Sequence, residues 1–492
     1  MTFKKIILTI LTLSIFTNPA QAGGFLYTRT SGAPTSWENP TSIPINPESG
    51  SCGDYSNSEM ITMIEEVLAN WTDIDEVNLG FDIQEGQIGE IDETNFSAAY
   101  YGSTSGVDND YTPYNAIIFD DDGDIHESLY GCSDLGQYLG VSTITDANSN
   151  GDISRASFVM NCACFRETHT VTCSDGSDPC EDNGIAYTEQ VMRAIFQHEM
   201  GHFLNLDHTP LYGNLFDDVN TANDDNVPLM YPFLENPDRD ISPKQDDIIA
   251  LATMYPSETF EDSYCTLTGT ILDQAASANE LQCAAINAIN TDQTESVSFI
   301  TGSTAPGTDL NSDGDLADYN TTTADYESTA DRGQFTLRLK PNKTYQISLA
   351  SINSAFTGTA QVNPCKNGQL PVCTDANLAD CNDGDESTDC DACITDDILL
   401  TSSEYITLYR DSCVAGATID VGTLTAVDSI SLESAVNFNG GVVAGDDDDD
   451  SAESSGCQLI LGSQNTGFQN LGLGFILGMS LIFRFFKRSR SL

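Results

Sequence analysis

Basic residues are scarce in this chain: 18 Lys and Arg stand against 75 Asp and Glu, giving a formal charge of −57 over 492 residues. So acidic a chain repels phosphate backbones, which excludes a nucleic-acid binder held by electrostatic attraction. Hydrophobic residues make up 40% of the chain, an ordinary share that argues against wholesale disorder. The length exceeds that of one hydrophobic core and predicts two or three domains.

Acidic residues are absent from the first 22 positions. Lys4 and Lys5 precede an apolar run there, and Ala20-Gln21-Ala22 offers the small residues that a signal peptidase accepts. We therefore expect residues 1–22 to be a signal peptide and the mature chain to begin at Gly23.

Acidic residues are also absent from residues 457–492, where the apolar stretch Leu471–Phe483 precedes basic residues. Its length of about 20 Å as a helix is short of a ~30 Å hydrocarbon core. This order of segments resembles the C-terminal sorting signals of bacterial surface proteins, with residues 445–456 as an acidic linker. The resemblance implies membrane contact, export and C-terminal processing machinery, and a bacterial cell surface or secreted location; a plain single-span anchor is the alternative.

Cysteine usage agrees with export. Fourteen of the 15 Cys lie between Cys52 and Cys413, an even number that allows up to seven disulfides. Their irregular spacing and an oxidising compartment favour disulfides over zinc clusters. Cys457 is left over and marks the expected processing point; the mass of the C-terminal peptide of surface-located protein distinguishes processing from an intact anchor.

Histidine is rare, yet three of the five His lie within eleven residues. On a helix, His198 and His202 share a face and can hold one Zn²⁺, with Glu199 placed to take a proton from metal-bound water. Asn205 tolerates the left-handed turn that brings His208 round as third ligand. The predicted helix has Thr188 as N-cap and apolar residues at helical spacing: Val191, Ile195, Phe203 and Leu204.

The segment His198–His208 resembles the HExxHxxGxxH pattern of the metzincin metallopeptidases, in their matrixin-like branch, with Asn205 where Gly is usual. Pro228–Pro232 is similar to the Met-turn of that family, which implies that Met230 supports the zinc histidines. Ile241–Leu251 resembles the closing helix. We expect Ser242 as its N-cap and four residues on its buried face: Ile248, Leu251, Ala252 and Tyr255.

The resemblance extends upstream over about residues 25–256. Trp37–Asn46 is similar to the opening strand, and Ala116–Phe119 is expected to be another. Ser56 and Glu59 predict a capped helix that buries Met60, Ile64, Val67, Leu68 and Trp71. The segment Gln137–Ser142 would be the edge strand that pairs with a peptide substrate through Tyr138, Leu139, Gly140 and Val141.

The chain departs from the family in two places. No inhibitory Cys precedes the first strand, so a cysteine-switch latency is not evident. Phe233 and Leu234 differ from the usual wall of the substrate pocket, which leaves the cleavage preference open.

A second metal is suggested by the acidic loop Asp309–Asp318, which resembles the start of an EF-hand or dockerin loop but has Asn320 where the last Glu ligand is expected. Calcium bound by Asp309, Asn311, Asp313 and Asp318 and a solvated acidic turn are equal alternatives. The segments Asp120–Asp124 and Asp146–Asp152 are weaker versions of the same pattern.

The resulting fold class is an α+β metzincin-like catalytic domain, with a twisted mixed sheet and a long active-site helix, followed by mostly β, disulfide-rich domains. Alternating polar and apolar residues predict strands over 265–273 and 333–347. The expected regions are a signal peptide (1–22), the peptidase domain (23–257), a β-sandwich-like domain with the acidic loop (258–355), a Cys-rich β region (356–444), the linker (445–456) and the sorting signal (457–492).

The function that follows is a secreted or surface-attached zinc endopeptidase acting on a protein or peptide. The alternative is a calcium-binding surface adhesion protein with an inactive metzincin-like domain, although an intact Glu199 argues against it. A glycan-degrading enzyme lacks the paired carboxylates that it would need.

If the acidic loop binds calcium, millimolar calcium should raise the melting temperature of the protein, since the ion binds only the native state. The double variant Asp309→Ala, Asp313→Ala should lose part of that increase in a thermal melt. An equal response to calcium in both proteins would rule out this loop.

Overall fold

The structure is a computed structural model, and it describes part of the chain. The described residues are 24–27, 29, 33–86, 88–96, 115–130, 139–148, 151–165, 188–209, 224–231, 233–234, 240–273, 285–290, 294–301, 319–320, 325–326, 333–350, 397–400, 406–408, 414–430 and 460–461. The predicted signal peptide, the acidic loop, the linker and nearly all of the sorting signal lie outside them. Among the described residues, no helix has the length and hydropathy needed to cross a membrane.

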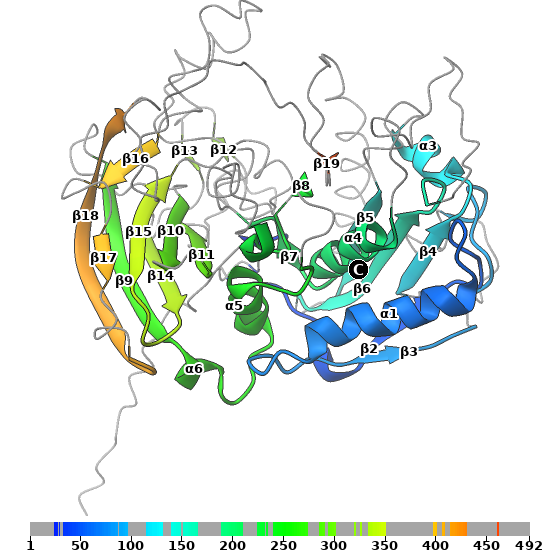
Figure 1. Ribbon diagram of the computed structural model, residues 1–492, viewed down its shortest axis with the longest axis horizontal. Coiled ribbons are helices and arrows are strands. Elements are labelled where there is room, and N and C mark those ends of the chain that lie inside the picture. The colour runs from blue at the N-terminus through cyan, green and yellow to red at the C-terminus, as the bar shows by residue number, and fades with distance from the viewer. Residues whose placement is uncertain are drawn as a thin grey trace, which may run out of the picture.

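The protein has a mixed α+β fold with several sheets and few helices (Figure 1). Its N-terminal unit is built on a five-stranded sheet of order β3-β2-β4-β6-β5. The strands are β2 (Ile43–Pro47), β3 (Phe81–Ile83), β4 (Ala116–Asp120), β5 (Gly140–Ala147) and β6 (Ile153–Asn161). All neighbours are parallel except β5 and β6, so the sheet ends in one antiparallel edge strand.

Two long helices accompany this sheet: α1 (Asn57–Thr72) and α4 (Glu189–Phe203). The α4 helix contacts β5 and β6 on one side and α1 on another. The indole Nε1 of Trp71 in α1 donates to the backbone carbonyl of Gln197 in α4 at 3.3 Å, which joins the two helices. The predicted cap of α1 is confirmed: Ser56 and Glu59 form a capping box, in which the backbone N–H of Ser56 donates to the Glu59 carboxylate at 2.8 Å, and the five predicted apolar residues are buried.

The expected opening strand is wrong at its start. Pro40–Ser42 forms the 3-10 helix η1, and β2 begins only at Ile43. Trp37 makes a single bridge to Ile153 and stacks its ring on Phe203 with centroids 5.3 Å apart. Proline at the first position of η1 favours this turn over an extended strand.

Two four-stranded sheets, of orders β14-β9-β18-β16 and β11-β10-β15-β17, contact each other through β14 of one and β10 and β11 of the other, and we refer to this pair of sheets as the β-sandwich. Their strands are β9 (Cys265–Asp273), β10 (Ala285–Asn290), β11 (Ser296–Ile300), β14 (Gln334–Leu339), β15 (Tyr345–Ala350), β16 (Asp397–Leu400), β17 (Ile406–Leu408) and β18 (Thr418–Ile430). The strands predicted over 265–273 and 333–347 are therefore present. Because β18 pairs with β9, strands from beyond residue 396 complete a sheet begun at Cys265.

Short elements fill the rest. They are β1 (Gly24–Phe25) paired with β7 (Leu206–Asp207), β8 (Phe233–Leu234) paired with β19 (Ile460–Leu461), β12 (Tyr319–Asn320) paired with β13 (Asp325–Tyr326), α3 (Asp124–Tyr130) and the 3-10 helix η4 (Asp224–Asn226).

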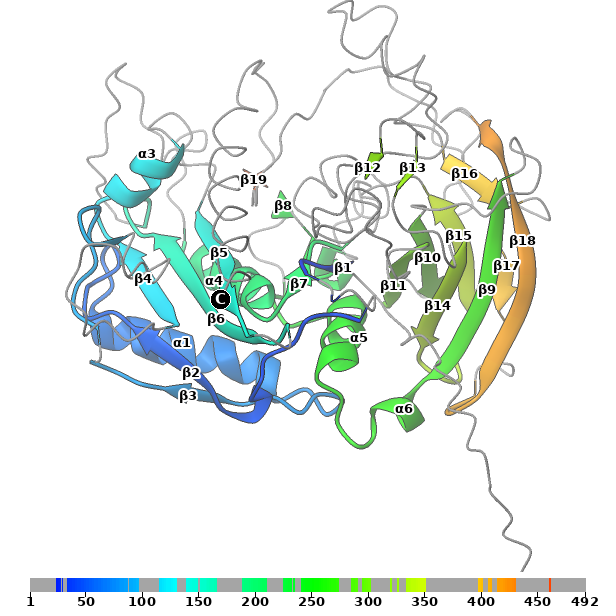
Figure 2. The same cartoon turned by 180° about the vertical axis from the view of Figure 1, so that it is seen from behind.

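Two helices, α5 (Gln245–Met254) and α6 (Phe260–Ser263), lie between the N-terminal unit and the β-sandwich in both opposite views (Figures 1 and 2). One continuous cluster of buried apolar side chains runs from the N-terminal unit through Tyr264 to Leu267 and Phe335 of the β-sandwich. The two parts therefore share a core.

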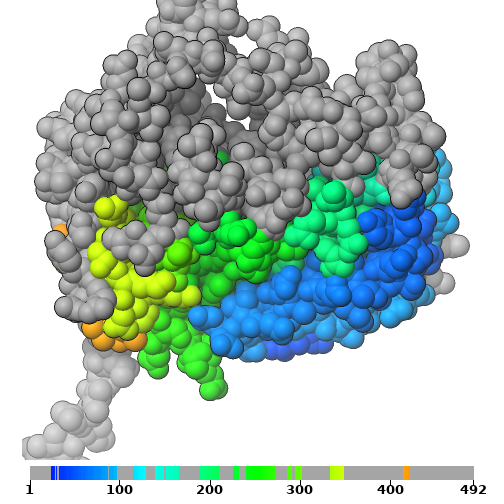
Figure 3. All heavy atoms as spheres, viewed as in Figure 1, coloured from blue at the N-terminus to red at the C-terminus, as the bar shows by residue number. Residues whose placement is uncertain are grey.

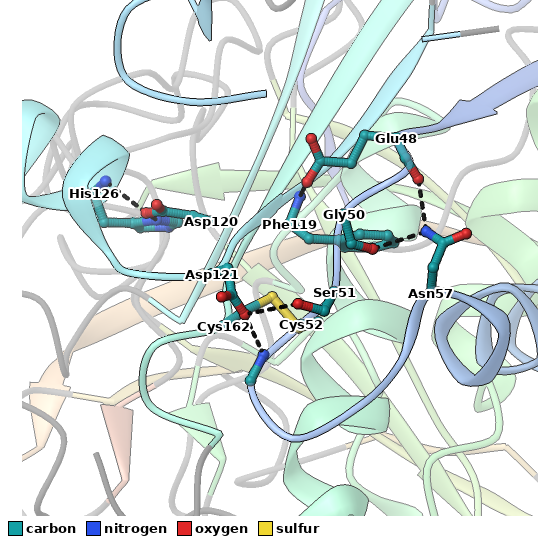
Figure 4. Close-up of a disulfide and its surroundings, with 11 residues drawn as sticks. Glu48, Gly50, Ser51, Cys52, Asn57, Phe119, Asp120, Asp121, His126 and Cys162 are labelled. Atoms are coloured by element: carbon teal, nitrogen blue, oxygen red, sulfur yellow. Dashed lines mark hydrogen bonds and ion pairs between the residues drawn. A yellow bond between two sulfur atoms is a disulfide. The ribbon is translucent and has the colours of Figure 1, made fainter. Parts of the chain in front are cut away.

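A disulfide joins Cys52, ahead of α1, to Cys162, which follows β6 (Figure 4). Cys164 and Cys265 are also disulfide-bonded, as expected for an oxidising compartment.

Beside this disulfide, the buried Glu48 ties three segments together (Figure 4). Its carboxylate accepts the backbone N–H groups of Phe119 at 2.7 Å and Ile91 at 2.5 Å. Burial raises the pKa of Glu48 to about 8, although these two N–H groups lower it. The folded protein therefore binds a proton here at pH values where the unfolded chain has lost it.

Glu48 should make the N-terminal unit less stable as the pH rises from 5 to 8. Because the folded state holds this extra proton in the window, Glu48 should lower the free energy of unfolding by up to about 1.4 kcal/mol per pH unit, and Glu48→Gln should reduce the slope of the wild type by that amount. Urea unfolding followed by tryptophan fluorescence measures it, because both Trp of the chain, Trp37 and Trp71, are buried in this unit. Exposed Glu59, whose pKa is lowered by Ser56, provides the control: Glu59→Gln should keep the wild-type slope. Parallel pH profiles of wild type and Glu48→Gln would contradict the assignment.

Candidate metal centre

The α4 helix begins as its sequence predicts. The side-chain oxygen of Thr188 accepts the backbone N–H of Val191 at 3.3 Å and satisfies one donor of the first turn. The apolar residues predicted for its buried face are indeed buried: Val191, Ile195, Phe203 and Leu204. His198 and His202, one turn apart near the end of the helix, are thereby fixed on one side of it.

The chain then reverses at Asn205, which has a φ of 80°. This left-handed conformation was expected, and β7 follows and returns the chain to α4 at His208. The three imidazoles of His198, His202 and His208 meet, with one potential ligand atom from each within 4.8 Å of the others. Within the described part of the chain, this is the only group of three or more His, Cys, Asp or Glu residues that can hold a metal ion.

Backbone carbonyls orient two of the rings. The Nδ1–H of His198 donates to the carbonyl of Leu229, and the Nδ1–H of His202 donates to that of Leu206, each at 2.8 Å. This tautomer places the lone pair on Nε2, where a metal ligand needs it. Burial also lowers the pKa of His202 to about 4 and holds the pKa of His208 well below its ordinary value. Both rings are therefore neutral near pH 7, as metal binding requires.

Glu199 lies beside the histidines and is 2% exposed. Its carboxylate accepts the backbone N–H of Ser142 in β5, while its Oε2 has no hydrogen-bond partner among the described residues. Burial raises the pKa of Glu199 to about 8. A buried carboxyl oxygen without a donor is costly unless a ligand or water uses it.

The edge strand β5 runs directly past this carboxyl group. A Cβ added to Gly140 would lie 2.8 Å from the Cγ of Glu199, so only glycine allows the strand to approach this closely. Val141 follows in the same strand, Leu139 precedes it, and Tyr138 lies outside the described residues. The strand begins at Gly140, later than the predicted Gln137, and runs on to Ala147.

Met230 is buried beneath α4, and a side chain at Gly201 would collide with its sulfur. The surrounding turn is held by Asp247 of α5, whose two carboxylate oxygens accept the backbone N–H groups of Leu229 at 2.7 Å and Met230 at 3.0 Å. Since the carbonyl of Leu229 orients His198, Asp247 supports this candidate metal ligand indirectly, through Leu229. The sequence reading missed Asp247; two adjacent acids in the first turn of a helix are usually exposed and carry no signal of such a role.

The N-cap of α5 differs from the expected Ser242. The helix begins at Gln245 after Lys244, whose backbone N–H donates to Asp247 at 2.7 Å. The hydroxyl of Ser242 donates to Asp240 at 2.8 Å, and its oxygen accepts the Nζ of Lys244 at 3.1 Å, so its bonds are made outside the helix. Of the predicted buried face, Leu251, Ala252 and Tyr255 are buried and Ile248 is only half-buried.

The predicted calcium ligands Asp309, Asn311, Asp313 and Asp318 lie outside the described residues. In each of the two weaker candidate segments, one carboxylate already has protein partners. Asp120 accepts the backbone N–H of His126 at 2.8 Å and pairs with its ring at 2.7 Å, and Asp152 forms an ion pair with Arg29.

Comparison with known proteins adds no assignment: no protein-family model matches this sequence, and no curated protein matches it.

Asn205 contributes more than its backbone conformation. Its Oδ1 accepts the N–H of Tyr27 at 2.9 Å, and its Nδ2 donates to the carbonyls of Tyr27 and Thr35 at 2.9 and 2.8 Å. The buried amide thus joins the turn before His208 to the N-terminal segment, which explains why Asn can stand where a left-handed turn usually takes Gly.

Replacing Asn205 should separate these two contributions. Asn205→Gly keeps the left-handed backbone but loses the amide hydrogen bonds, which should lower the free energy of unfolding by about 1–3 kcal/mol. Asn205→Ala should lose about 1–2 kcal/mol more, because its Cβ strains the left-handed conformation. Urea unfolding of both variants gives the comparison. An alanine variant as stable as the glycine variant would show that the backbone conformation is unimportant.

Proposed function

We propose that this protein is a zinc endopeptidase with a metzincin-like N-terminal unit. The observation that carries the proposal is the convergence of His198, His202 and His208 beside the buried Oε2 of Glu199. Three neutral imidazoles suit zinc, and three protein ligands leave a coordination position open, as in catalytic rather than structural zinc sites. When bound, zinc supplies Lewis-acid polarisation of a carbonyl oxygen and lowers the pKa of water.

Glu199 is the proposed general base and acid. Its Oε2 takes the proton from the attacking water and returns it to the leaving amine. The backbone N–H of Ser142 holds the other part of the carboxyl group, so that the reactive oxygen stays in place.

The substrate proposed is an extended peptide that pairs with β5. As the edge strand of its sheet, β5 can add one further strand by backbone hydrogen bonds. Because Gly140 brings β5 against Glu199, a peptide on that edge would carry its scissile bond past the carboxyl group. We also propose that the protein is exported. The Cys52–Cys162 disulfide supports an oxidising destination.

Glu199→Gln should retain zinc and lose peptidase turnover by at least about a hundredfold, because the ligands remain and the base is removed. Metal analysis of the purified protein, together with digestion of casein with and without a zinc chelator, measures both properties. Glu189→Gln is the matched control, since Glu189 lies at the exposed start of the same helix and forms an ion pair with Arg193 at 2.8 Å; it should keep full turnover.

Undiminished proteolysis by Glu199→Gln would overturn the mechanism. Wild-type protein that holds zinc but cleaves nothing in a peptide library would favour the surface-binding alternative.

A further inference from the structure

The other acid at the start of α5, Asp246, touches both parts of the molecule. It is 1% exposed and accepts three hydrogen bonds. Its Oδ2 accepts the hydroxyl of Thr209 at 2.6 Å, and its Oδ1 accepts the backbone N–H and the hydroxyl of Ser298 at 2.7 and 2.9 Å. One carboxylate oxygen therefore faces the metal-binding loop and the other faces the β-sandwich.

Thr209 directly follows the third histidine. Its backbone N–H donates to the carbonyl of Met230 at 3.0 Å, and its hydroxyl is held by Asp246. These two bonds fix the chain immediately after His208, whereas Asn205 fixes it before His208. The position of the third imidazole thus depends on two anchors, one before it and one after it.

Ser298 belongs to the middle of β11, opposite Asn287 of β10, and is fully buried. A residue in a paired strand is held more rigidly than one in a loop, so Ser298 gives Asp246 a fixed support. If the serine hydroxyl were lost, the buried carboxylate would lose one of its three donors, and its position would relax.

Further contacts hold the same interface. Gln245 Nε2 donates to the hydroxyl of Tyr264 at 2.9 Å, and that hydroxyl donates to Glu76 at 3.1 Å. In the space-filling view, the green residues around α5 and α6 adjoin both the blue N-terminal surface and the yellow-green surface of the β-sandwich (Figure 3). The β-sandwich therefore packs directly against the N-terminal unit at α5, and a residue of β11 can help to fix the position of a residue beside the histidines.

We propose that the β-sandwich is a structural part of the metal centre: Ser298 of β11 holds Asp246, and Asp246, through Thr209, positions the third ligand His208. Asp246 and Ser298 are positioning residues and do not touch the metal or the substrate. The inference rests on the proposed zinc site, but its consequence is a change in zinc affinity rather than in the chemical step.

The test measures zinc affinity of the full chain by competition with a chromogenic chelator, and the absorption spectrum of the cobalt-substituted protein. Asp246→Asn and Thr209→Val should each weaken zinc binding about tenfold, as for other residues that orient metal ligands, and should shift the cobalt spectrum. Ser298→Ala should have a smaller effect, about threefold, because its backbone N–H remains. Thr209→Ser and Ser298→Thr keep the hydroxyl and should bind zinc as the wild type does.

Tyr345→Phe is the control for general loss of stability. It removes a buried hydroxyl of the same sheet that donates to Glu295 at 3.1 Å and forms no hydrogen bond with Asp246, Thr209 or Ser298, so it should leave zinc affinity and the cobalt spectrum unchanged. The Ser298 hydroxyl also lies 3.3 Å from the Thr209 hydroxyl, so Ser298 reaches Thr209 both directly and through Asp246. In the double variant Thr209→Val, Ser298→Ala, zinc binding should therefore be no weaker than in Thr209→Val alone, because both routes end at the Thr209 hydroxyl.

Folded Asp246→Asn or Thr209→Val with wild-type zinc affinity would overturn the inference. If Asp246→Asn does not fold, Thr209→Val is compared with Thr209→Ser. Equal zinc affinities of these two variants would show that the hydroxyl is not needed and would also overturn the inference. Wild-type protein that binds no zinc would overturn the proposed function as well, whereas zinc binding without peptidase activity would leave this inference standing.

Discussion

The candidate metal centre depends on a reversal of the chain between His202 and His208. Two histidines on one helix cannot complete a three-ligand site, so the third must return from beyond the end of α4. The left-handed backbone of Asn205, with φ of 80°, makes this return possible within a few residues. Its amide then ties the turn to Tyr27, so residues from the start of the described chain also fix the site.

The α5 helix also supports the three histidines, from the C-terminal side of the candidate metal centre in the chain. Two neighbouring carboxylates in its first turn serve different partners: Asp247 holds the turn around Met230, and Asp246 joins Thr209 to Ser298. Both are nearly inaccessible to solvent, which costs free energy unless donors surround them. The helix is consequently buried on nearly every side, because it lies between two structural units rather than on a surface.

What the sequence predicts well is local. Thr188 as N-cap and the spacing of the histidines require only neighbouring residues, and the structure agrees with both. The start of α5 differs from the prediction. The carboxylate of Asp247 accepts the backbone N–H of Lys244, whereas the hydroxyl of Ser242 donates to Asp240. The roles of Asp246 and Asp247 could not be predicted, since their partners lie 17 to 52 residues away in the chain and a pair of acids in a helical first turn is ordinary.

The disulfide between Cys52 and Cys162 spans 110 residues and encloses α1 and strands β3 to β6, but leaves α4 outside. Closing a loop of this length removes about 4–5 kcal/mol of chain entropy from the unfolded state, a large share of the 5–15 kcal/mol typical of a whole domain. The scaffold on which the histidine helix rests is thus most stable only after oxidation. The stability of the scaffold beneath the candidate metal centre is thereby linked to the redox state of its surroundings, because reducing conditions remove this cross-link.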